Sequence, residues 1–265
     1  MTTVVLGHSG FIGKHIYKLL KKKQNSVIGG NSKNCNLLKK RQIKSFFKKK
    51  KNFNLIICSS LVRSKFDTKK SYNQNILMIS NLIKVIDKKT IRKIIFLSSI
   101  DVYKKTGILN ENNSKIKPDT KYGHYKLFAE NLLKKYISKN KLTILRLTGV
   151  YDDDINGQNM ISFIRRGLKK NYLNIKSSGE ELRDYVHAND VAKTIYLFLK
   201  NDNYGVFNLA SGVSKKVKYF VKKLNKTYSS NNLAIFYNPE NHLNDKIVNV
   251  NKIKKVISIK DFKKI

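Results

Sequence analysis

The first 150 residues alternate short apolar segments with amphipathic ones, and this alternation limits the possible folds more than any other feature of the sequence. Apolar runs predict strands at residues 2–6, 26–29, 54–58, 93–98 and 142–147. Apolar residues three and four positions apart predict helices at residues 11–23, 37–51, 72–87 and 121–138. Strands that are apolar throughout are typical of parallel sheets with helices on both faces. Because crossovers are right-handed, the sequence predicts an α/β protein with a doubly wound parallel sheet.

The sequence changes character after residue 150. Residues 152–158 are polar and loop-like. Helices are predicted at 160–170, 191–200 and 215–225, and strands at 206–209 and 233–237. We expect one domain over residues 1–150, onto which parts of 184–211 pack back, and a small second region over 151–265.

The chain is strongly basic. Its 265 residues include 55 Lys and Arg against 17 Asp and Glu, which gives a formal net charge of +38. Lysines outnumber arginines 48 to 7 and are spread along the whole chain, whereas nucleic-acid readers favour arginine forks and exposed aromatic side chains. We therefore expect no specific nucleic-acid partner, although a positive field attracts anionic small molecules.

Cysteine content and hydropathy suggest a compartment. The two cysteines, Cys35 and Cys58, cannot form a disulfide framework. No apolar run approaches the ~18 residues of a membrane span, and the first strand opens without the apolar region of a signal peptide. These features predict a soluble cytoplasmic protein with reduced thiols and no membrane partner.

Three glycines, Gly7, Gly10 and Gly13, lie between the first predicted strand and the first predicted helix. Glycine permits a sharp turn and a close approach of backbone N–H groups to a pyrophosphate. The helix N-terminus behind the turn favours the same negative charge. The pattern therefore predicts a dinucleotide site, and makes residues 1–150 a dinucleotide-binding domain.

Two other glycine motifs are incomplete here. A phosphate-binding P-loop needs Ser or Thr after Gly13-Lys14, and this chain has His15. A nucleophile elbow built on Ser9 needs glycine at the position of Phe11. A serine hydrolase is therefore an unfavoured alternative.

The end of the second strand bears on the choice of cofactor. NAD sites often place an acid here, where it accepts from the ribose 2′-OH. This chain has Asn31, Ser32 and Lys33 instead, which suit a 2′-phosphate. We expect NAD(P) as cofactor, with NADP favoured over NAD, while the alternative is that Lys33 is an ordinary surface lysine.

Tyr122 and Lys126 lie one helical turn apart at the start of a predicted helix, so both side chains reach one site. A tyrosine that moves protons near neutral pH needs its anion stabilised, and an ammonium and an oxidised nicotinamide both supply positive charge. Tyr125 is expected to point to a different face from Lys126. Ser98 and Ser99 end the fourth strand, at the sheet edge where ligands bind in such folds.

These motifs, taken in order, resemble the extended short-chain dehydrogenase/reductase superfamily, in its NAD-dependent epimerase/dehydratase family. The segments that carry the resemblance are Gly7-His-Ser-Gly-Phe-Ile-Gly13, Leu97-Ser-Ser-Ile-Asp-Val-Tyr103, Tyr122-Gly-His-Tyr-Lys126, Arg146-Leu-Thr-Gly-Val-Tyr151 and Arg183-Asp-Tyr-Val-His-Ala-Asn-Asp190, from residue 3 to about 212. The resemblance implies a Rossmann-type fold with a small C-terminal substrate-binding part. It also implies an enzyme that acts on nucleotide-diphosphate sugars, and a homodimer formed through the helices at 72–87 and 121–138.

The resemblance also implies roles for individual residues. The catalytic set is Ser99 as the hydroxyl, Tyr122 as acid and base, and Lys126 as the partner of both Tyr122 and the nicotinamide ribose. The cofactor set is Gly7, Gly10, Phe11, Ile12, Gly13 and Asn75, to which the missing acid after the second strand adds Asn31, Ser32 and Lys33. The substrate set is Asp101, Asn159 and Arg183, with Arg183 on the diphosphate, and no metal is expected.

Two departures narrow the reaction. The 4,6-dehydratases of the family carry adjacent Asp and Glu after the catalytic hydroxyl, whereas this chain has Ile100-Asp101, which disfavours dehydration. A late arginine that commonly grips the diphosphate is replaced by Asn238-Pro239. An NAD(P)-dependent epimerase or reductase is the main hypothesis. A non-catalytic dinucleotide-binding sensor or scaffold is the alternative.

Overall fold

The computed structural model describes residues 1–61, 67–104, 107–228, 233–241 and 243–265. Their contacts divide the chain into two compact units. Unit 1 comprises Met1–Lys104, Lys115–Leu147 and Val191–Phe207, and unit 2 comprises Lys105–Ser114, Thr148–Asp190 and Asn208–Ile265.

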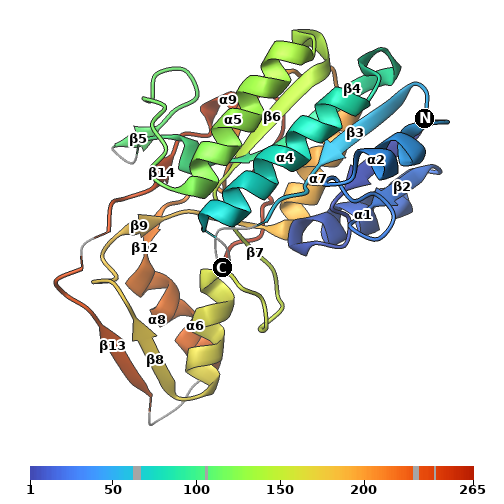
Figure 1. Cartoon of the computed structure of the whole chain (residues 1–265). Coiled ribbons are helices and arrows are strands. Elements are labelled where there is room, and N and C mark those ends of the chain that lie inside the picture. Colours follow the sequence, from blue (N-terminus) through green and yellow to red (C-terminus); the bar gives the residue numbers. More distant parts are fainter. Residues whose placement is uncertain (62–66, 105–106, 229–232, 242) are drawn as a thin grey trace. The chain divides into compact units, whose positions relative to one another are not determined.

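A six-stranded sheet forms the centre of unit 1 (Figure 1). Its strands are β1 (Thr3–Leu6), β2 (Val27–Gly30), β3 (Phe53–Ile57), β4 (Ile91–Ser99), β6 (Leu142–Leu147) and β11 (Gly205–Leu209), in the order β11-β6-β4-β3-β1-β2. Parallel pairing joins β1 to both β2 and β3, β3 to β4, and β4 to β6. The doubly wound parallel sheet is thus confirmed. The strand order reverses at β1, and ligands of such sheets bind at the carboxyl ends beside this reversal.

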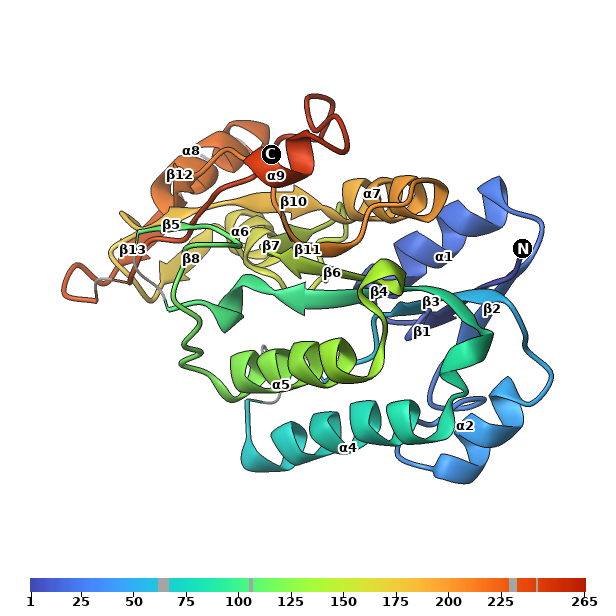
Figure 2. The same ribbon diagram turned by 90° about the horizontal axis from the view of Figure 1, so that it is seen from above.

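Helices cover both faces of this sheet (Figure 2). One face carries α2 (Lys40–Phe47), α4 (Lys69–Val85) and α5 (Lys121–Tyr136), and the other carries α1 (Phe11–Lys23) and α7 (Ala188–Lys200). Buried aliphatic side chains such as Leu55, Ile94 and Leu82 form the core under the first group. Each such side chain contributes about 1.5–3 kcal/mol on burial.

The predicted helix at 37–51 is wrong at both ends, since α2 is shorter. Leu37 is buried, but it lies in a loop, where the Asn81 side chain donates to its carbonyl oxygen at 3.1 Å. An apolar side chain buried from a loop has the same appearance in the sequence as one on a helix face.

Unit 2 is built from short strands and two helices. Helices α6 (Met160–Lys169) and α8 (Val217–Tyr228) share a core with the parallel pair β8 (Tyr172–Ile175) and β13 (Ala234–Tyr237). Its other strands are β5 (Ile108–Leu109), β7 (Gly149–Tyr151), β9 (Leu182–Arg183), β10 (Tyr185–His187), β12 (Lys215–Lys216) and β14 (Ile247–Val248), followed by α9 (Asn251–Lys254). These six strands have only two or three residues, which is too short to leave a periodic signal, so the sequence did not predict them.

Across the described residues, every helix falls short of the length or the hydropathy that crossing a membrane requires.

Candidate active site

The glycine turn between β1 and α1 is closely packed. Gly7 has φ of +83°, its N–H donates to the Gly30 carbonyl at 2.7 Å, and its own carbonyl accepts from the Gly10 N–H at 3.0 Å. A Cβ atom on Gly13 would lie 2.0 Å from the Gly7 carbonyl oxygen, which no side chain tolerates. The glycine at position 13 therefore lets α1 begin directly against the turn.

The first turn of α1 presents its backbone N–H groups without a side-chain cap. The N-cap residue is Gly10, which has no side chain to cap the helix, and the first turn holds no acidic residue. The N–H groups of Phe11, Ile12 and Gly13 have no acceptor within the helix, because the first turn of any helix leaves its donors unpaired. This end of α1 has the chemistry of an anion site.

The loop after β3 lies against the glycine turn. A Cβ atom on Gly7 would lie 2.9 Å from the backbone nitrogen of Ser59. Asn75, buried on α4, holds this loop: its amide donates to the Leu61 carbonyl at 3.1 Å and its oxygen accepts from the Leu61 N–H at 2.8 Å. Because both polar ends of Asn75 bind Leu61, Asn75 acts on the site by shaping this loop.

The residues after β2 form their own hydrogen-bonded turn. The Asn31 side-chain oxygen accepts from the Lys33 N–H at 2.9 Å, and the Asn31 N–H donates to the Asn34 side chain at 2.8 Å. The side chains of Ser32 and Lys33 are exposed beside this turn. The cation at position 33 is therefore available to a solvent-borne anion, whereas the Asn31 oxygen is used within the turn.

Two caps fix the start of α5, where the tyrosine and lysine lie. The Thr120 hydroxyl accepts from the Gly123 N–H at 3.0 Å, and the Asp67 carboxylate accepts from the Tyr122 N–H at 2.9 Å. Gly123 allows a further approach, since a Cβ atom there would lie 2.3 Å from the Asp101 carbonyl oxygen. The start of α5 therefore packs directly on the short 3₁₀ helix η2 (Ile100–Val102) that follows β4.

The structure brings Tyr122 and Lys126 together. Lys126 is buried, its Nζ lies 5.3 Å from the centre of the Tyr122 ring, and it donates to the Leu97 carbonyl oxygen at 2.6 Å. The expectation that Tyr125 points elsewhere is wrong, because the same Nζ lies 5.2 Å from the Tyr125 ring. The long side chain of Lys126 reaches both rings. The two tyrosines differ instead in the partners of their hydroxyl groups.

Those hydroxyls have different partners. The Tyr125 hydroxyl donates to the Ser59 carbonyl at 3.5 Å, whereas the Tyr122 hydroxyl is hydrogen-bonded to the Ser60 side chain. Ser60 did not emerge from the sequence analysis. Its signal was present, since Ser59-Ser60 follows β3 at the same sheet edge at which Ser98-Ser99 ends β4.

The surroundings shift the pKa values of this pair. Burial lowers the pKa of Lys126 to about 7, although Cys58 and Glu130 act in the opposite direction. Burial, reinforced by the negative charge of Asp101, raises the pKa of Tyr122, which the Ser60 hydrogen bond opposes. Titratable groups perturbed in this way are typical of functional sites.

Ser99 immediately precedes η2, the short helix on which the start of α5 packs. It is buried at the end of β4, and its hydroxyl accepts from the Asp101 N–H at 3.1 Å. Asp101 is buried as well, and its carboxylate acts on Tyr122. Unit 1 therefore gathers Ser99, Asp101, Tyr122 and Lys126 around one end of α5.

Asn159 and Arg183 belong to unit 2. Asn159 caps α6, with its oxygen accepting from the Ser162 N–H at 2.9 Å, and its buried amide nitrogen has no hydrogen-bond partner among the described residues. The Arg183 guanidinium donates to the carbonyls of Leu182 and Asn244, both at 2.8 Å. The predicted roles of both residues in substrate binding stay predictions.

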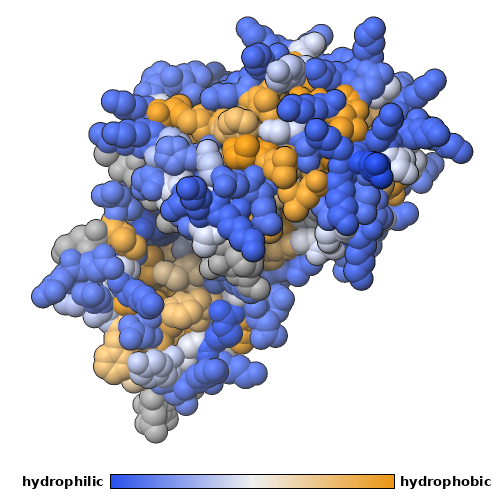
Figure 3. Space-filling model, in the orientation of Figure 1, coloured by the Kyte–Doolittle hydropathy of each residue, from blue (hydrophilic) through white to orange (hydrophobic). Residues whose placement is uncertain are grey.

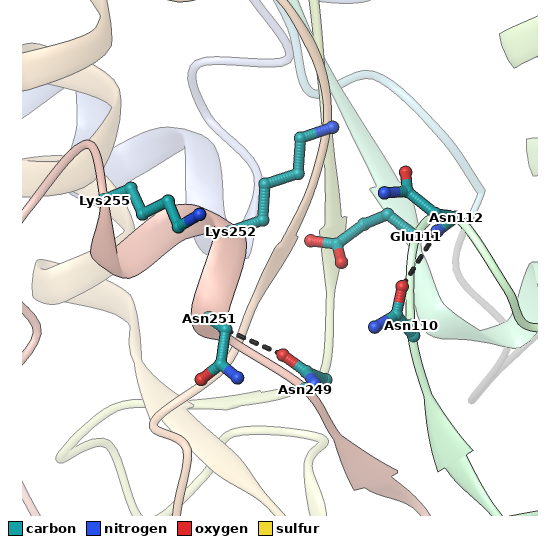
Figure 4. A pocket seen from close by; sticks show the side chains of 7 residues that line it. All are labelled: Asn110, Glu111, Asn112, Asn249, Asn251, Lys252 and Lys255. Atoms are coloured by element: carbon teal, nitrogen blue, oxygen red, sulfur yellow. Dashed lines mark hydrogen bonds between the residues drawn. The ribbon is translucent and has the colours of Figure 1, made fainter.

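A polar pocket of about 270 Å³ also lies in unit 2 (Figure 4). It is lined by Asn110, Glu111, Asn112, Asn249, Asn251, Lys252 and Lys255. Glu111 accepts from the Asn208 N–H at 2.6 Å, and the Asn249 oxygen accepts from the Asn251 N–H at 2.8 Å. These groups hold the chain beside β5 and β14. The described residues include no cluster of three or more His, Cys, Asp or Glu suited to a metal ion.

Comparison with known proteins points to one family. Residues 3–210 match the family described as NAD dependent epimerase/dehydratase. The chain is 24% identical to CDP-abequose synthase of Salmonella typhimurium over 254 residues, which cover 88% of this chain and 83% of that protein. It is 33% identical to a putative UDP-glucose 4-epimerase of Methanocaldococcus jannaschii over 154 residues, which cover 54% of this chain and 49% of that protein.

A solved structure has the same fold. The UDP-glucose 4-epimerase of Thermus thermophilus, solved in complex with NAD, superposes with a TM-score of 0.82 at 18% sequence identity. The match covers 96% of this chain and 92% of that one.

The depressed pKa of Lys126 predicts an unusual pH dependence of stability. Between pH 7 and 10.5 the unfolded chain binds a proton at this lysine that the folded chain does not, so the free energy of unfolding rises with pH in that window. Lys126→Met removes the free-energy cost of burying the ammonium group. We expect the variant to be more stable than the parent at pH 6, by about 2–4 kcal/mol, and the gain to shrink toward pH 10. Urea unfolding at pH 6, 8 and 10 measures it.

The exposed Lys135 on the same helix provides the control, since Lys135→Met removes a cation that lies in solvent and should change stability little. A gain in stability for Lys126→Met that is the same at every pH would contradict the conclusion that burial lowers the pKa of Lys126.

Proposed function

The chain belongs to the NAD dependent epimerase/dehydratase family, and from that premise we propose that it is an NAD(P)-dependent epimerase or reductase of a nucleotide-diphosphate sugar. One observation carries the proposal: the Lys126 ammonium lies 5.3 Å from the Tyr122 ring, at the sheet edge to which the glycine turn also belongs. The names of the two curated relatives support the substrate class, since one is a CDP-sugar synthase and the other a putative UDP-sugar epimerase.

The glycine turn suits the cofactor. Uncapped N–H groups at the start of α1 would bind its pyrophosphate, and a side chain at Gly13 would separate α1 from the turn. When bound, NAD(P) supplies an acceptor and donor of hydride together with a positive charge. The chain's own residues supply the proton transfers and the orientation of the sugar.

Tyr122 is the proposed acid and base. Its phenol exchanges a proton with the hydroxyl on the reacting sugar carbon, as that carbon interconverts between alcohol and ketone. Burial and Asp101 raise the pKa of Tyr122, which keeps the phenol protonated at rest, weakens it as a proton donor and opposes formation of its anion. Lys126 in its ammonium form, with the Ser60 hydrogen bond, stabilises that anion, and Ser99 donates a hydrogen bond to the same sugar oxygen.

Dehydration is the less suitable reaction. The residue before Asp101 is Ile100, which cannot act as an acid, so the adjacent acidic pair of the dehydratases is incomplete. Asp101 itself lies beside Tyr122, where it suits a role in binding the sugar. Arg183 and Asn159 are the proposed partners of the diphosphate.

Tyr122→Phe tests the catalytic assignment. The variant keeps the ring beside Lys126 but cannot move a proton, so turnover should fall at least about 100-fold. Cofactor affinity should change less than about 3-fold, because the pyrophosphate site is untouched. The assay follows nicotinamide absorbance and product formation with a panel of UDP-, CDP-, GDP- and dTDP-sugars.

Tyr136→Phe, at the exposed end of the same helix, is the matched control and should behave as the parent. Undiminished turnover in Tyr122→Phe would refute the mechanism. Cofactor binding without turnover in the parent would favour the sensor or scaffold.

The proposed cofactor is NADP in preference to NAD. Ser32 and Lys33 are exposed after β2, and no acid stands there to accept from a ribose 2′-OH. Lys33→Ala should weaken NADP binding about 5–10-fold, by removing one cation from the 2′-phosphate, and leave NAD binding unchanged. Calorimetric titration with each nucleotide measures both constants.

Lys49→Ala, which removes another exposed lysine, should alter neither constant. If the parent binds NAD more tightly than NADP, the proposed preference for NADP is wrong.

A homodimer through α4 and α5 completes the proposal. Apolar side chains gather over these two helices (Figure 3), where Leu77, Phe128 and Tyr136 are 48%, 37% and 43% exposed. Exposed apolar groups concentrated on one face mark interaction surfaces. Leu77→Glu buries a charge in such an interface and should convert a dimer into a monomer. Sedimentation velocity measures the mass.

Leu38→Glu provides the comparison, since Leu38 is 37% exposed in a loop and its substitution should leave the dimer intact. A monomeric parent protein would disprove this part of the proposal.

The proposed location is the cytoplasm. Both cysteines carry free thiols, Cys35 buried and Cys58 half-buried, and burial raises the pKa of each. Free thiols suit a reducing compartment.

A further inference from the structure

A buried ion pair lies behind the candidate catalytic residues. The Glu130 side chain on α5 is fully buried and its carboxylate accepts three hydrogen bonds. The Ser98 hydroxyl donates to it at 2.5 Å, and Arg146 donates from Nε at 3.0 Å and from Nη2 at 2.6 Å. A buried ion pair is often no more stabilising than apolar residues of the same volume, because both charges lose their hydration. Stability alone therefore gives a weak reason for this pair.

The contacts of the pair point to the active site. Glu130 lies one helical turn after Lys126, on the same face of α5. Lys126 donates to the carbonyl of Leu97, and the next residue, Ser98, donates to Glu130. Two consecutive residues of β4 are thus bound by two consecutive turns of α5. The residue after them is Ser99, so these two bonds set the register between the catalytic hydroxyl and the lysine.

Arg146 joins a second strand to this arrangement. Its Cα atom is the register partner of Ser98 in the parallel pairing of β4 with β6. The Tyr103 ring, just beyond η2, lies 4.7 Å from the guanidinium carbon. Glu130 therefore ties together β4, β6 and α5, the three elements that frame Ser99 and Lys126.

Glu130 is also the counter-charge of Lys126. The titratable groups acting on this lysine are Cys58 after β3, and Tyr122, Tyr125 and Glu130 on α5 itself. Burial raises the pKa of Cys58 to about 12 and also raises the pKa of both tyrosines, so these three are neutral near pH 7. Asp101 acts on Tyr122 from η2, and Arg146 lies beyond Glu130. The carboxylate of Glu130 thus opposes the loss of the lysine's proton.

We propose that Glu130 is a positioning residue of the active site: with Ser98 and Arg146 it locks the end of β4 to α5, and its charge favours the ammonium form of Lys126. The catalytic part of this inference rests on the proposed function. The electrostatic part concerns the protein alone and is measured without substrate.

The first experiment measures the proton affinity of Lys126 in two backgrounds. The difference in unfolding free energy between the parent and Lys126→Met is followed from pH 5 to 10.5. Its slope against pH rises from zero as the folded lysine loses its proton, and the midpoint of that rise in slope is the pKa of the folded lysine. The same difference is measured between Glu130→Gln and Glu130→Gln/Lys126→Met. Loss of the carboxylate should move the midpoint down by about one pH unit or more, since the ammonium loses its counter-charge.

Two further variants keep the result interpretable. Lys134→Met removes an exposed cation 3.6 Å from Glu130 and should leave the midpoint within a few tenths of a unit, as expected for a screened surface charge. Glu130→Gln leaves Arg146 buried without its partner, which strongly destabilises the fold and can unfold this variant. In that event Glu130→Gln/Arg146→Met, which removes both charges, replaces it. A midpoint unchanged in the charge-free background would overturn the electrostatic role.

The second experiment follows the pH profile of kcat/KM. Losing the ammonium at a lower pH should move the alkaline limb of Glu130→Gln to lower pH, whereas a merely structural defect lowers the whole profile without moving it. Ser98→Ala, which removes one bond to the carboxylate and no charge, should lower kcat about 10-fold with the limb in place. If both variants have the parent's kcat and profile, the positioning role is wrong.

The two proposals fail in different ways. A parent protein that turns over no sugar nucleotide contradicts the proposed function, while the stability curves still decide whether Glu130 holds the charge of Lys126. An active parent whose Glu130→Gln variant shows neither a moved midpoint nor a moved limb contradicts this inference alone.

Discussion

The burial of one lysine ammonium organises the active end of unit 1. Lys126 is 2% exposed, and its Nζ donates to the Leu97 carbonyl between the faces of several aromatic rings. An ammonium in such surroundings is costly unless carbonyl oxygens, ring faces and a counter-ion replace its water. Those replacements come from β4 and from α5 itself, so satisfying this one group requires the helix and the strand to meet in a single register.

The glycines are the steric counterpart of that requirement. Gly13 lets α1 touch the turn after β1, and Gly123 lets α5 touch η2. In both places a Cβ atom would lie within about 2.3 Å of a carbonyl oxygen, so the close approach exists only with glycine. One approach opens an anion site and the other brings Tyr122 to the end of β4. The proposed cofactor site and the proposed catalytic site thus use the same device, at the ends of β1 and β4, the two strands that flank β3.

The hydrogen-bond network of Glu130 lies behind the candidate site. Glu130 receives hydrogen bonds from both β4 and β6, and its charge acts on Lys126, which lies one turn earlier on α5. By the proposal for Glu130, one side chain serves both packing and electrostatics. A charge-neutral variant such as Ser98→Ala changes the packing and keeps the carboxylate, so it distinguishes the two effects.

Much of this site was visible in the sequence, because the responsible rules are local. The glycine spacing at a strand-to-helix junction and the four-residue spacing of Tyr122 and Lys126 follow from backbone geometry within a few residues. The alternation of strands and helices likewise predicted the doubly wound sheet, since burial on both faces requires continuously apolar strands.

Other parts depended on residues that are distant in the chain. Asp67 caps α5 from 55 residues away, and the ion pair of Glu130 with Arg146 crosses from a helix to a strand. The place of Tyr125 was misjudged because helical position fixes the direction of Cβ but not the reach of a four-carbon lysine side chain. The sequence by itself thus determined the sheet, the glycine turn and the Tyr-Lys spacing, which depend on neighbours along the chain. Only the tertiary structure decided which hydroxyl meets Tyr122 and which charge faces Lys126, because those partners are chosen by packing.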